Sequence, residues 1–359
     1  MTGQPSTTDV HQAVVDAAET GRPVALAVVL KDIGSTPRKA GTKAIIDARG
    51  AIVGTIGGGR VEAETQRRAV AALRAARPLV FDVALEGGSA EGHQPICGGM
   101  MRILVDPTAA DHRAAYAQAV EARRRRWRSV LLTTVRGAPR PEVAVQWFAQ
   151  DSVPTDLGFP GVETIRSTAS DRTPTYLVQD RPEEGGRLEV LIEPLNPSPL
   201  LVIAGGGHIG QALAAQAGLV GFDIVVIDDR SEFVESALYP KGVGTRCTDI
   251  AEGLAEFPVD GDTYIALVTR GHVQDKAALA ACIHSPAAYI GMIGSTRKVA
   301  LIRRDLLETG TATDEELSRV YAPIGLDIGA QTVPEIAASI VAQMIAVRRT
   351  GTAPRMPTA

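Results

Sequence analysis

The chain has 359 residues, 45% of them hydrophobic, and a formal net charge of −4. This length predicts two domains, because a single hydrophobic core stops growing near about 250–300 residues. The weak negative charge excludes a general attraction to nucleic acid or anionic membranes, and we expect the one basic run, residues 123–128, to be a solvated helix face.

No apolar run approaches the roughly 20 residues needed to span a bilayer, and the first twelve residues are polar. We therefore expect a soluble, cytoplasmic protein. Three cysteines, Cys97, Cys247 and Cys282, lack the close spacing of a disulfide framework or a zinc site.

Residues 1–195 predict a mixed α/β domain. A helix near residues 10–18 and a valine-rich strand at 23–30 lead into a polar loop and then a hairpin that ends at residue 56. The hairpin runs into Gly57, Gly58 and Gly59, a run that costs backbone entropy unless positive φ or a close approach requires it. Two interpretations stay open, a tight turn with the helix-start acids Glu62 and Glu64, or an anion-binding nest of amides.

A second glycine-rich stretch, residues 86–93, precedes Cys97, Gly98 and Gly99. A cysteine flanked by glycines can be accessible and activated by nearby amides, whereas a structural cysteine usually lies in an apolar face. The spacing leaves both interpretations open. Further strands and one helix complete the domain, and residues 196–199, with two prolines, predict a linker.

Residues 200–230 predict a strand, a glycine turn, a helix and a second strand that ends in an acid. Gly205, Gly207 and Gly210 form G-x-G-x-x-G directly after an apolar run, and Asp228 follows after about 20 residues. This pattern predicts a Rossmann-like doubly wound parallel sheet over residues 196–350, followed by a disordered tail at 351–359. We expect the turn to bind a pyrophosphate and Asp228 to bind the ribose of NAD(P) or another adenosine nucleotide.

Three loops add candidate residues at the ligand-facing edge of this sheet. His208, inside the glycine turn, is expected to touch a ligand phosphate. His272 follows a buried strand and is either a proton carrier or ligand, or a structural hydrogen-bonding residue. Gly294, Ser295 and Arg297 follow another strand and suit a second phosphate contact.

Together these motifs resemble the XdhC/CoxI family of accessory factors for xanthine dehydrogenase and carbon monoxide dehydrogenase. The likeness spans nearly the whole chain. It is carried by GSTPRKAGTKAII, GTIGGGRVEAE and ICGGM in the first domain, and by VIAGGGHIGQALA, VIDDR, TRGHVQDKAAL, IGMIGSTRKVA and APIGLDIGAQTVPEIAASI in the second. Two positions depart from the family pattern, since Asp106 and Gln343 stand where the family tends to have Glu.

The resemblance implies a maturation factor rather than an enzyme in its own right. Such a factor binds molybdenum cofactor, as molybdopterin or its dinucleotide form, protects it while a cysteine desulfurase installs its terminal sulfido ligand, and delivers it to a molybdenum hydroxylase apoenzyme. Carried over by position, the resemblance marks as cofactor-binding Gly57, Gly58, Gly59, Glu62, Cys97, Gly98 and Gly99. It gives Cys97 the role of molybdenum ligand or sulfur carrier and leaves a homodimer open.

Two other classes of function compete with this expectation. One is an NAD(P)-dependent oxidoreductase that uses Asp228 for the ribose and His272 as acid or base, although the sequence offers no substrate-polarising pair beside the nicotinamide position. The other is a scaffold for the desulfurase and hydroxylase with an empty nucleotide site.

Overall fold

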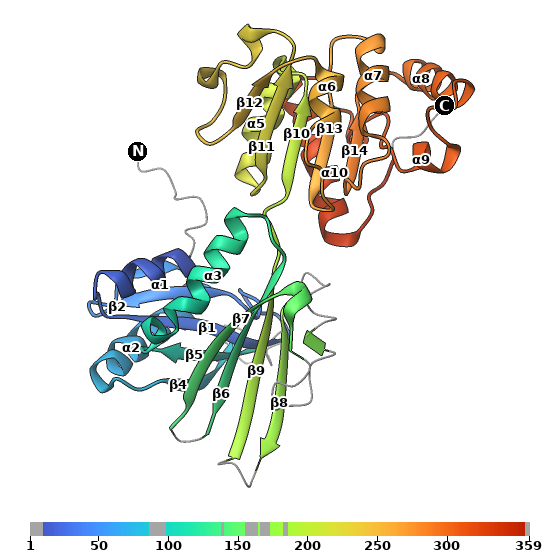
Figure 1. Cartoon of the computed structure of the whole chain (residues 1–359). Coiled ribbons are helices and arrows are strands. Elements are labelled where there is room, and N and C mark those ends of the chain that lie inside the picture. The colour runs from blue at the N-terminus through green and yellow to red at the C-terminus, as the bar shows by residue number, and fades with distance from the viewer. Residues whose placement is uncertain are drawn as a thin grey trace, which may run out of the picture. The chain divides into compact units, whose positions relative to one another are not determined.

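The computed structural model describes residues 10–85, 98–137, 140–154, 164–165, 173–181 and 186–355. The chain forms two compact units, Met1–Pro197 and Ser198–Ala359 (Figure 1). The division falls within the predicted linker at 196–199. None of the helices in these ranges is both long and apolar enough to cross a membrane.

The first unit begins with an antiparallel sheet in the order β3-β2-β1-β5-β4. Helix α2 covers one face, where Val61 and Ala69 pack against Ala27 and Ile103. Helix α1 lies on the other face. The elements are α1 (Val10–Glu19), β1 (Val24–Ile33), β2 (Lys43–Asp47), β3 (Ile52–Gly54), α2 (Gly59–Ala75), β4 (Leu79–Leu85) and β5 (Gly99–Asp106).

A second antiparallel sheet, in the order β7-β6-β9-β8, belongs to the same unit. One core joins the two sheets, because Leu26 and Val28 of the first pack with Leu131 and Leu191 of the second, together with Tyr116 of α3. The elements are η1 (Ala109–His112), α3 (Arg113–Arg124), β6 (Ser129–Arg136), β7 (Glu142–Ala149), η2 (Gln150–Ser152), β8 (Thr175–Arg181) and β9 (Gly186–Leu195).

Ion pairs also connect the two sheets. Lys43 of β2 pairs with Glu193 of β9, and only 6% and 5% of these side chains are exposed. Arg102 of β5 donates to both carboxylate oxygens of Glu189 in β9, at 2.7 and 2.6 Å, and also to Asp82 of β4. Both pairs are formed only when the sheets pack in this register.

The second unit contains one parallel sheet in the order β12-β11-β10-β13-β14. Numbered within the unit this is 3-2-1-4-5, the strand order of a Rossmann fold. The predicted fold class, a mixed α/β unit followed by a Rossmann-like unit, is confirmed. The strands are β10 (Leu200–Ala204), β11 (Asp223–Asp228), β12 (Gly244–Cys247), β13 (Thr263–Leu267) and β14 (Tyr289–Met292).

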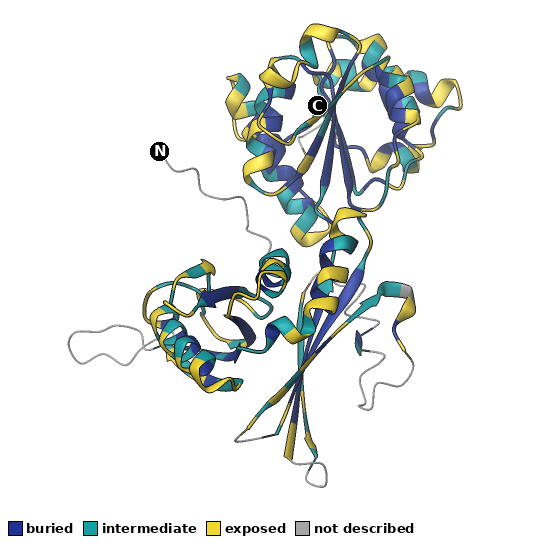
Figure 2. Ribbon diagram, turned by 60° about the vertical axis from the view of Figure 1, so that its left-hand side comes forward, coloured by how far each residue is buried: buried dark blue, intermediate teal, exposed yellow. Residues whose placement is uncertain are grey.

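Helices cover both faces of this sheet, and Figure 2 shows its strands buried between helices whose outer surfaces are exposed. Helices α5 and α10 pack on one face, and α6, α7 and α8 pack on the other. A capping box of Thr332 and Glu335 starts α10. The helices are α5 (His208–Leu219), η4 (Ser231–Phe233), η5 (Ser236–Leu238), α6 (Ile250–Ala255), α7 (His272–Cys282), α8 (Thr296–Glu308), α9 (Asp314–Ser318) and α10 (Val333–Thr350).

Residues 351–355, at the start of the expected disordered tail, make hydrogen bonds within the second unit. The Ala353 amide donates to the Tyr321 hydroxyl at 3.3 Å, and the Gln343 side chain donates to the Pro354 carbonyl at 3.0 Å. Both partners, Tyr321 and Gln343, are buried side chains, and disorder of the tail stays a prediction.

Candidate functional site

Three glycine-containing segments meet in the first unit. A Cβ on Gly57 would lie 2.7 Å from Cγ of Pro37, and a Cβ on Gly34 would lie 3.2 Å from the Gly98 carbonyl oxygen. A Cβ on Gly99 would collide with the Ser35 carbonyl. The loop after β1, the turn after β3 and the start of β5 therefore approach one another at positions where only glycine fits.

Asp32, near the end of β1, holds the loop that Gly57 and Gly99 contact. Its carboxylate accepts hydrogen bonds from the Ala40 amide at 2.9 Å, Lys39 Nζ at 2.8 Å and Thr36 Oγ1 at 3.4 Å. Burial alone would raise the pKa of Asp32, but these donors outweigh burial and lower it. Asp32 was not predicted as a site residue, and the only signal for it was an acid between a strand and a polar loop.

Glu62 fills part of the glycine turn. Its Oε2 accepts hydrogen bonds from the Ile56 amide at 3.2 Å, the Gly58 amide at 3.3 Å and Thr55 Oγ1 at 2.8 Å. These contacts fit the interpretation as a tight turn with a helix-start acid. Gly58 and Gly59 nevertheless have φ of 74° and 57°, and a Cβ on either would meet no atom within 4 Å. The turn thus keeps open space beside two backbone positions, and anion binding there stays a prediction.

Cys97 lies outside the described residues, so its predicted role stays a prediction. The residues that follow it are described. Gly98 is exposed, and Gly99 begins β5 against the loop that contains Ser35. The end of the CGG segment therefore lies beside the loop held by Asp32.

In the second unit, the predicted residues gather at one edge of the sheet. The glycine turn follows β10, Asp228 ends β11, His272 follows β13, and residues 294–297 follow β14. Because all five strands are parallel, these positions share the carboxyl edge, where Rossmann folds bind their ligands.

The three glycines of the G-x-G-x-x-G motif have different surroundings. A Cβ on Gly205 would lie 2.6 Å from the Val268 carbonyl oxygen, and one on Gly210 would collide with the Gly205 carbonyl. A Cβ on Gly207 would meet nothing within 4 Å. Gly205 and Gly210 are thus required by packing, whereas Gly207 leaves space beside the backbone where a ligand could approach.

Asp228 is 1% exposed, and protein donors occupy both of its carboxylate oxygens. The Gly206 amide donates to Oδ2 at 2.8 Å, and Arg230 donates through its amide, Nε and Nη2 at 2.9–3.0 Å. Burial alone would raise the pKa of Asp228, but these hydrogen bonds lower it. Ribose binding by Asp228 stays a prediction, and it would require Arg230 to move.

The remaining edge residues divide into exposed and buried groups. His272, Ser295 and Arg297 are exposed. Lys298, by contrast, points inward and pairs with Asp275, which is fully buried and also accepts a hydrogen bond from Thr269 Oγ1 at 2.6 Å. Within the described ranges, no group of three or more His, Cys, Asp or Glu residues could hold a metal ion.

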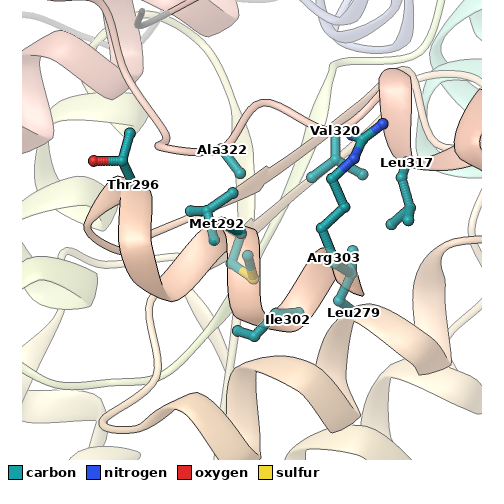
Figure 3. A pocket seen from close by; sticks show the side chains of 10 residues that line it. Leu279, Met292, Thr296, Ile302, Arg303, Leu317, Val320 and Ala322 are labelled. Carbon is teal, nitrogen blue, oxygen red and sulfur yellow. The ribbon is translucent and has the colours of Figure 1, made fainter. Parts of the chain in front are cut away.

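A separate pocket of about 400 Å³ lies beneath α8 in the second unit (Figure 3). Its walls are mainly apolar, and the Arg303 guanidinium, at one side, donates to Asp314 at 2.6 Å. No predicted site residue lines it. The lining residues are Leu279, Met292, Thr296, Val299, Ala300, Ile302, Arg303, Leu317, Val320 and Ala322.

The fold and the two groups of motif residues define a two-unit α/β protein with a Rossmann domain. Residues 201–344 match the family description "XdhC Rossmann domain", and residues 17–83 match "XdhC and CoxI family". The chain belongs to the XdhC and CoxI family, as the resemblance predicted.

Two relatives align with most of the chain. The uncharacterized protein YqeB of Escherichia coli (strain K12) is 26% identical over 327 residues, which cover 91% of this chain and 44% of YqeB. The chain therefore spans less than half the length of YqeB. A Bacillus subtilis (strain 168) protein, described as a probable xanthine dehydrogenase subunit, is 24% identical over 328 residues, which cover 90% of this chain and 93% of the relative.

Among solved structures, a protein described as a xanthine dehydrogenase from Bacillus halodurans has a similar fold. It superposes with a TM-score of 0.70 at 23% identity, covering 95% of this chain and 96% of the other. At this identity the likeness shows the fold alone.

Proposed function

We propose that this protein is a maturation factor for a molybdenum hydroxylase of the xanthine dehydrogenase type. In this proposal the first unit binds molybdenum cofactor as cargo, protects it while a cysteine desulfurase installs its terminal sulfido ligand, and delivers it to the apoenzyme. Membership of the XdhC and CoxI family supports the maturation role, as does the likeness to the Bacillus subtilis relative described as a probable xanthine dehydrogenase subunit.

The observation that carries the proposal is the meeting of three motif segments in the first unit. Gly57, Gly34 and Gly99 bring the turn, the loop and the end of the CGG segment together. The Ile56, Gly57 and Gly58 amides already donate to the side chains of Glu62 and Thr55, so the space left for a ligand at this meeting point is the open side of Gly58 and Gly59.

The groups present fit an anionic cargo. Gly58 and Gly59 leave open space beside the start of α2, where the helix dipole favours a phosphate, and a phosphate there would lie next to the Glu62 carboxylate that accepts from the Gly58 amide. Arg38 is exposed, and its Cγ lies 3.5 Å from the position of a Cβ on Gly57, so it brings a positive charge to the turn. In the proposal these groups hold the phosphate of the cofactor, and Cys97 provides a thiolate for the molybdenum or for the incoming sulfur.

The test compares cargo retention in two matched glycine variants. Gly59 and Gly21 both have positive φ, 57° and 64°, and both face open space, but Gly21 lies in the turn between α1 and β1. Asparagine tolerates this backbone region, so Gly59→Asn and Gly21→Asn carry a similar conformational cost. We expect Gly59→Asn to lose at least about tenfold in molybdenum per protomer after anaerobic purification, and Gly21→Asn to match the parent.

Cys97→Ala, purified in the same way, tests the thiol. We expect it either to lose molybdenum or to yield co-expressed hydroxylase that lacks its sulfido ligand. Parent-like molybdenum content and parent-like hydroxylase activity in both Gly59→Asn and Cys97→Ala would contradict the proposal. Mass spectrometry of the material that elutes from the parent discriminates the alternatives, because a nicotinamide nucleotide with turnover would favour an oxidoreductase and an empty protein would favour a scaffold.

A further inference from the structure

Arg230 is held in a fixed position beside the glycine turn of the second unit. Its Nε and Nη2 donate to the two oxygens of Asp228 at 2.9 and 3.0 Å. Its guanidinium also lies over the ring of Phe233, 3.7 Å from the ring centroid. A guanidinium that makes two hydrogen bonds along one edge and stacks on a ring with one face has little freedom to rotate. The Arg230 side chain is nevertheless 27% exposed, so a ligand can reach it.

Asp228 itself has no capacity left for a ligand. An ionised carboxylate has about four acceptor sites, and the Gly206 amide together with three donors of Arg230 fills that number. The acid that would bind the 2′- and 3′-hydroxyls of an unmodified ribose is thus already satisfied. Displacing Arg230 in favour of two neutral hydroxyls would exchange charge-assisted hydrogen bonds for weaker ones.

The guanidinium, by contrast, can still donate. It has five N–H groups, and the structure gives two of them to Asp228, so both hydrogens of Nη1 and one of Nη2 have no hydrogen-bond acceptor within the described part of the chain. The second acid of the strand end, Asp229, lies 3.8 Å from Nε but is engaged by Arg270 at 2.8 Å and by Gln274 at 3.2 Å. A third acid, Glu232, adds a negative charge near Arg230, and the structure gives it no hydrogen bond to the guanidinium, so the three remaining N–H groups are available to a bound anion.

We propose that the second unit binds a nucleotide whose ribose carries a 2′-phosphate, and that Arg230 is the specificity-determining residue that binds this phosphate. In the Rossmann arrangement, the acid at the end of the second strand lies at the ribose hydroxyls, and an arginine near it accommodates a phosphate there. Here the acid positions the arginine, Phe233 supports its face, and Gly207 leaves the path for the diphosphate open. This inference concerns the second unit alone and does not depend on the cargo proposed for the first.

The experiment is calorimetric titration of the full-length protein with NADP⁺ and with NAD⁺. We expect NADP⁺ to bind roughly tenfold to hundredfold more tightly, the range for hydrogen bonds between charged groups. In Arg230→Ala the affinity for NADP⁺ should fall by at least about tenfold. The affinity for NAD⁺ should stay the same or rise, because Asp228 is released to accept ribose hydroxyls. Arg230→Lys, which keeps the charge, should retain part of the preference for NADP⁺.

Arg348→Ala is the matched control, because Arg348 also lies over a phenylalanine ring, that of Phe222, and Phe222 precedes β11 at the opposite edge of the sheet. This variant should bind both nucleotides as the parent does. The inference is overturned if the parent binds NAD⁺ as tightly as NADP⁺, or if it binds neither at millimolar concentration. It is also overturned if a folded Arg230→Ala or Arg230→Lys loses affinity for both nucleotides equally, since that result would give Arg230 only a structural role.

Discussion

Gln343→Glu is expected to make the stability of the second unit depend on pH. The Gln343 side chain is fully buried in α10 and uses its whole amide. Its Oε1 accepts from the Tyr289 hydroxyl at 2.6 Å and the Gly325 amide at 2.9 Å, and its Nε2 donates to the carbonyls of Gly325 and Pro354 at 3.0 Å each. The substitution tests whether the acid that the family pattern leads one to expect can occupy this site.

A glutamate would keep the two accepted hydrogen bonds but would turn its second oxygen toward two carbonyl oxygens. Burial and these carbonyls would raise its folded pKa above the unfolded value of about 4.3. A carboxyl with a raised folded pKa loses stability as pH rises above the unfolded value, because the folded state then binds more protons than the unfolded state. We expect a cost of about 2 kcal/mol at pH 5, where the folded carboxyl is protonated, and about 3–5 kcal/mol at pH 8, where a charge must be buried.

Urea denaturation at pH 5 and pH 8 checks this expectation. The tyrosine signal in near-ultraviolet circular dichroism follows the site, because Tyr289 stacks between Tyr264 and Tyr321 at 6.0 and 4.9 Å. Both tryptophans of the chain, Trp127 and Trp147, belong to the first unit, so tryptophan fluorescence supplies an internal control that should not change. A variant that matches the parent at both pH values would refute the assigned hydrogen bonds.

Two further pairs of variants test the packing described above. Lys43→Ala should destabilise the first unit by about 3–5 kcal/mol, because Glu193 is left as a buried charge without its partner. The double variant Lys43→Met with Glu193→Leu should recover most of that loss. Tryptophan fluorescence in urea measures both variants, and equal stability of Lys43→Ala and the parent would contradict the buried pair. Gly207→Val should fold with a Tm within about 2 °C of the parent yet lose NADP⁺ binding, whereas Gly210→Val should fail to fold, since only a Cβ at residue 210 collides with the backbone. Thermal melts measure the folding of both variants, and calorimetry measures NADP⁺ binding. Similar melting of the two variants would be inconsistent with this prediction.

The sequence predicted the second unit well, because its signals are local. A strand, a glycine turn, a helix and an acid follow one another within residues 200–230, and parallel buried strands have continuous apolar runs. The strand order then follows from the usual rules for parallel sheets. The first unit was less predictable. Its strands were expected to complete one domain, but their division into two sheets depends on pairings such as β1 with β5, which are distant in sequence and leave no local pattern.

The candidate site shows the same limit. Gly57 and Gly99 were identified as glycines with a special role, but the atoms that require them, on Pro37 and Ser35, could be known only from the fold. Asp228 was expected to bind a ribose, but its carboxylate oxygens accept hydrogen bonds from Arg230, only two residues away. The sequence alone does not show which way a flexible arginine side chain points. The neighbouring Phe233 was missed for the same reason.

The position of β5 has a consequence for how this protein can be divided or recombined. The family description matched by residues 17–83 ends within β4, yet β4 pairs only with β5 in the sheet, and β5 lies between β4 and β1. A fragment ending there would leave the edges of β1 and β4 without β5 and would remove Glu193, the ion-pair partner of Lys43. The smallest part of the first unit that can be exchanged between relatives as a folded module therefore extends through β9 to the end of the unit at Pro197, and chimaeras should be joined there rather than at the boundary of the sequence match.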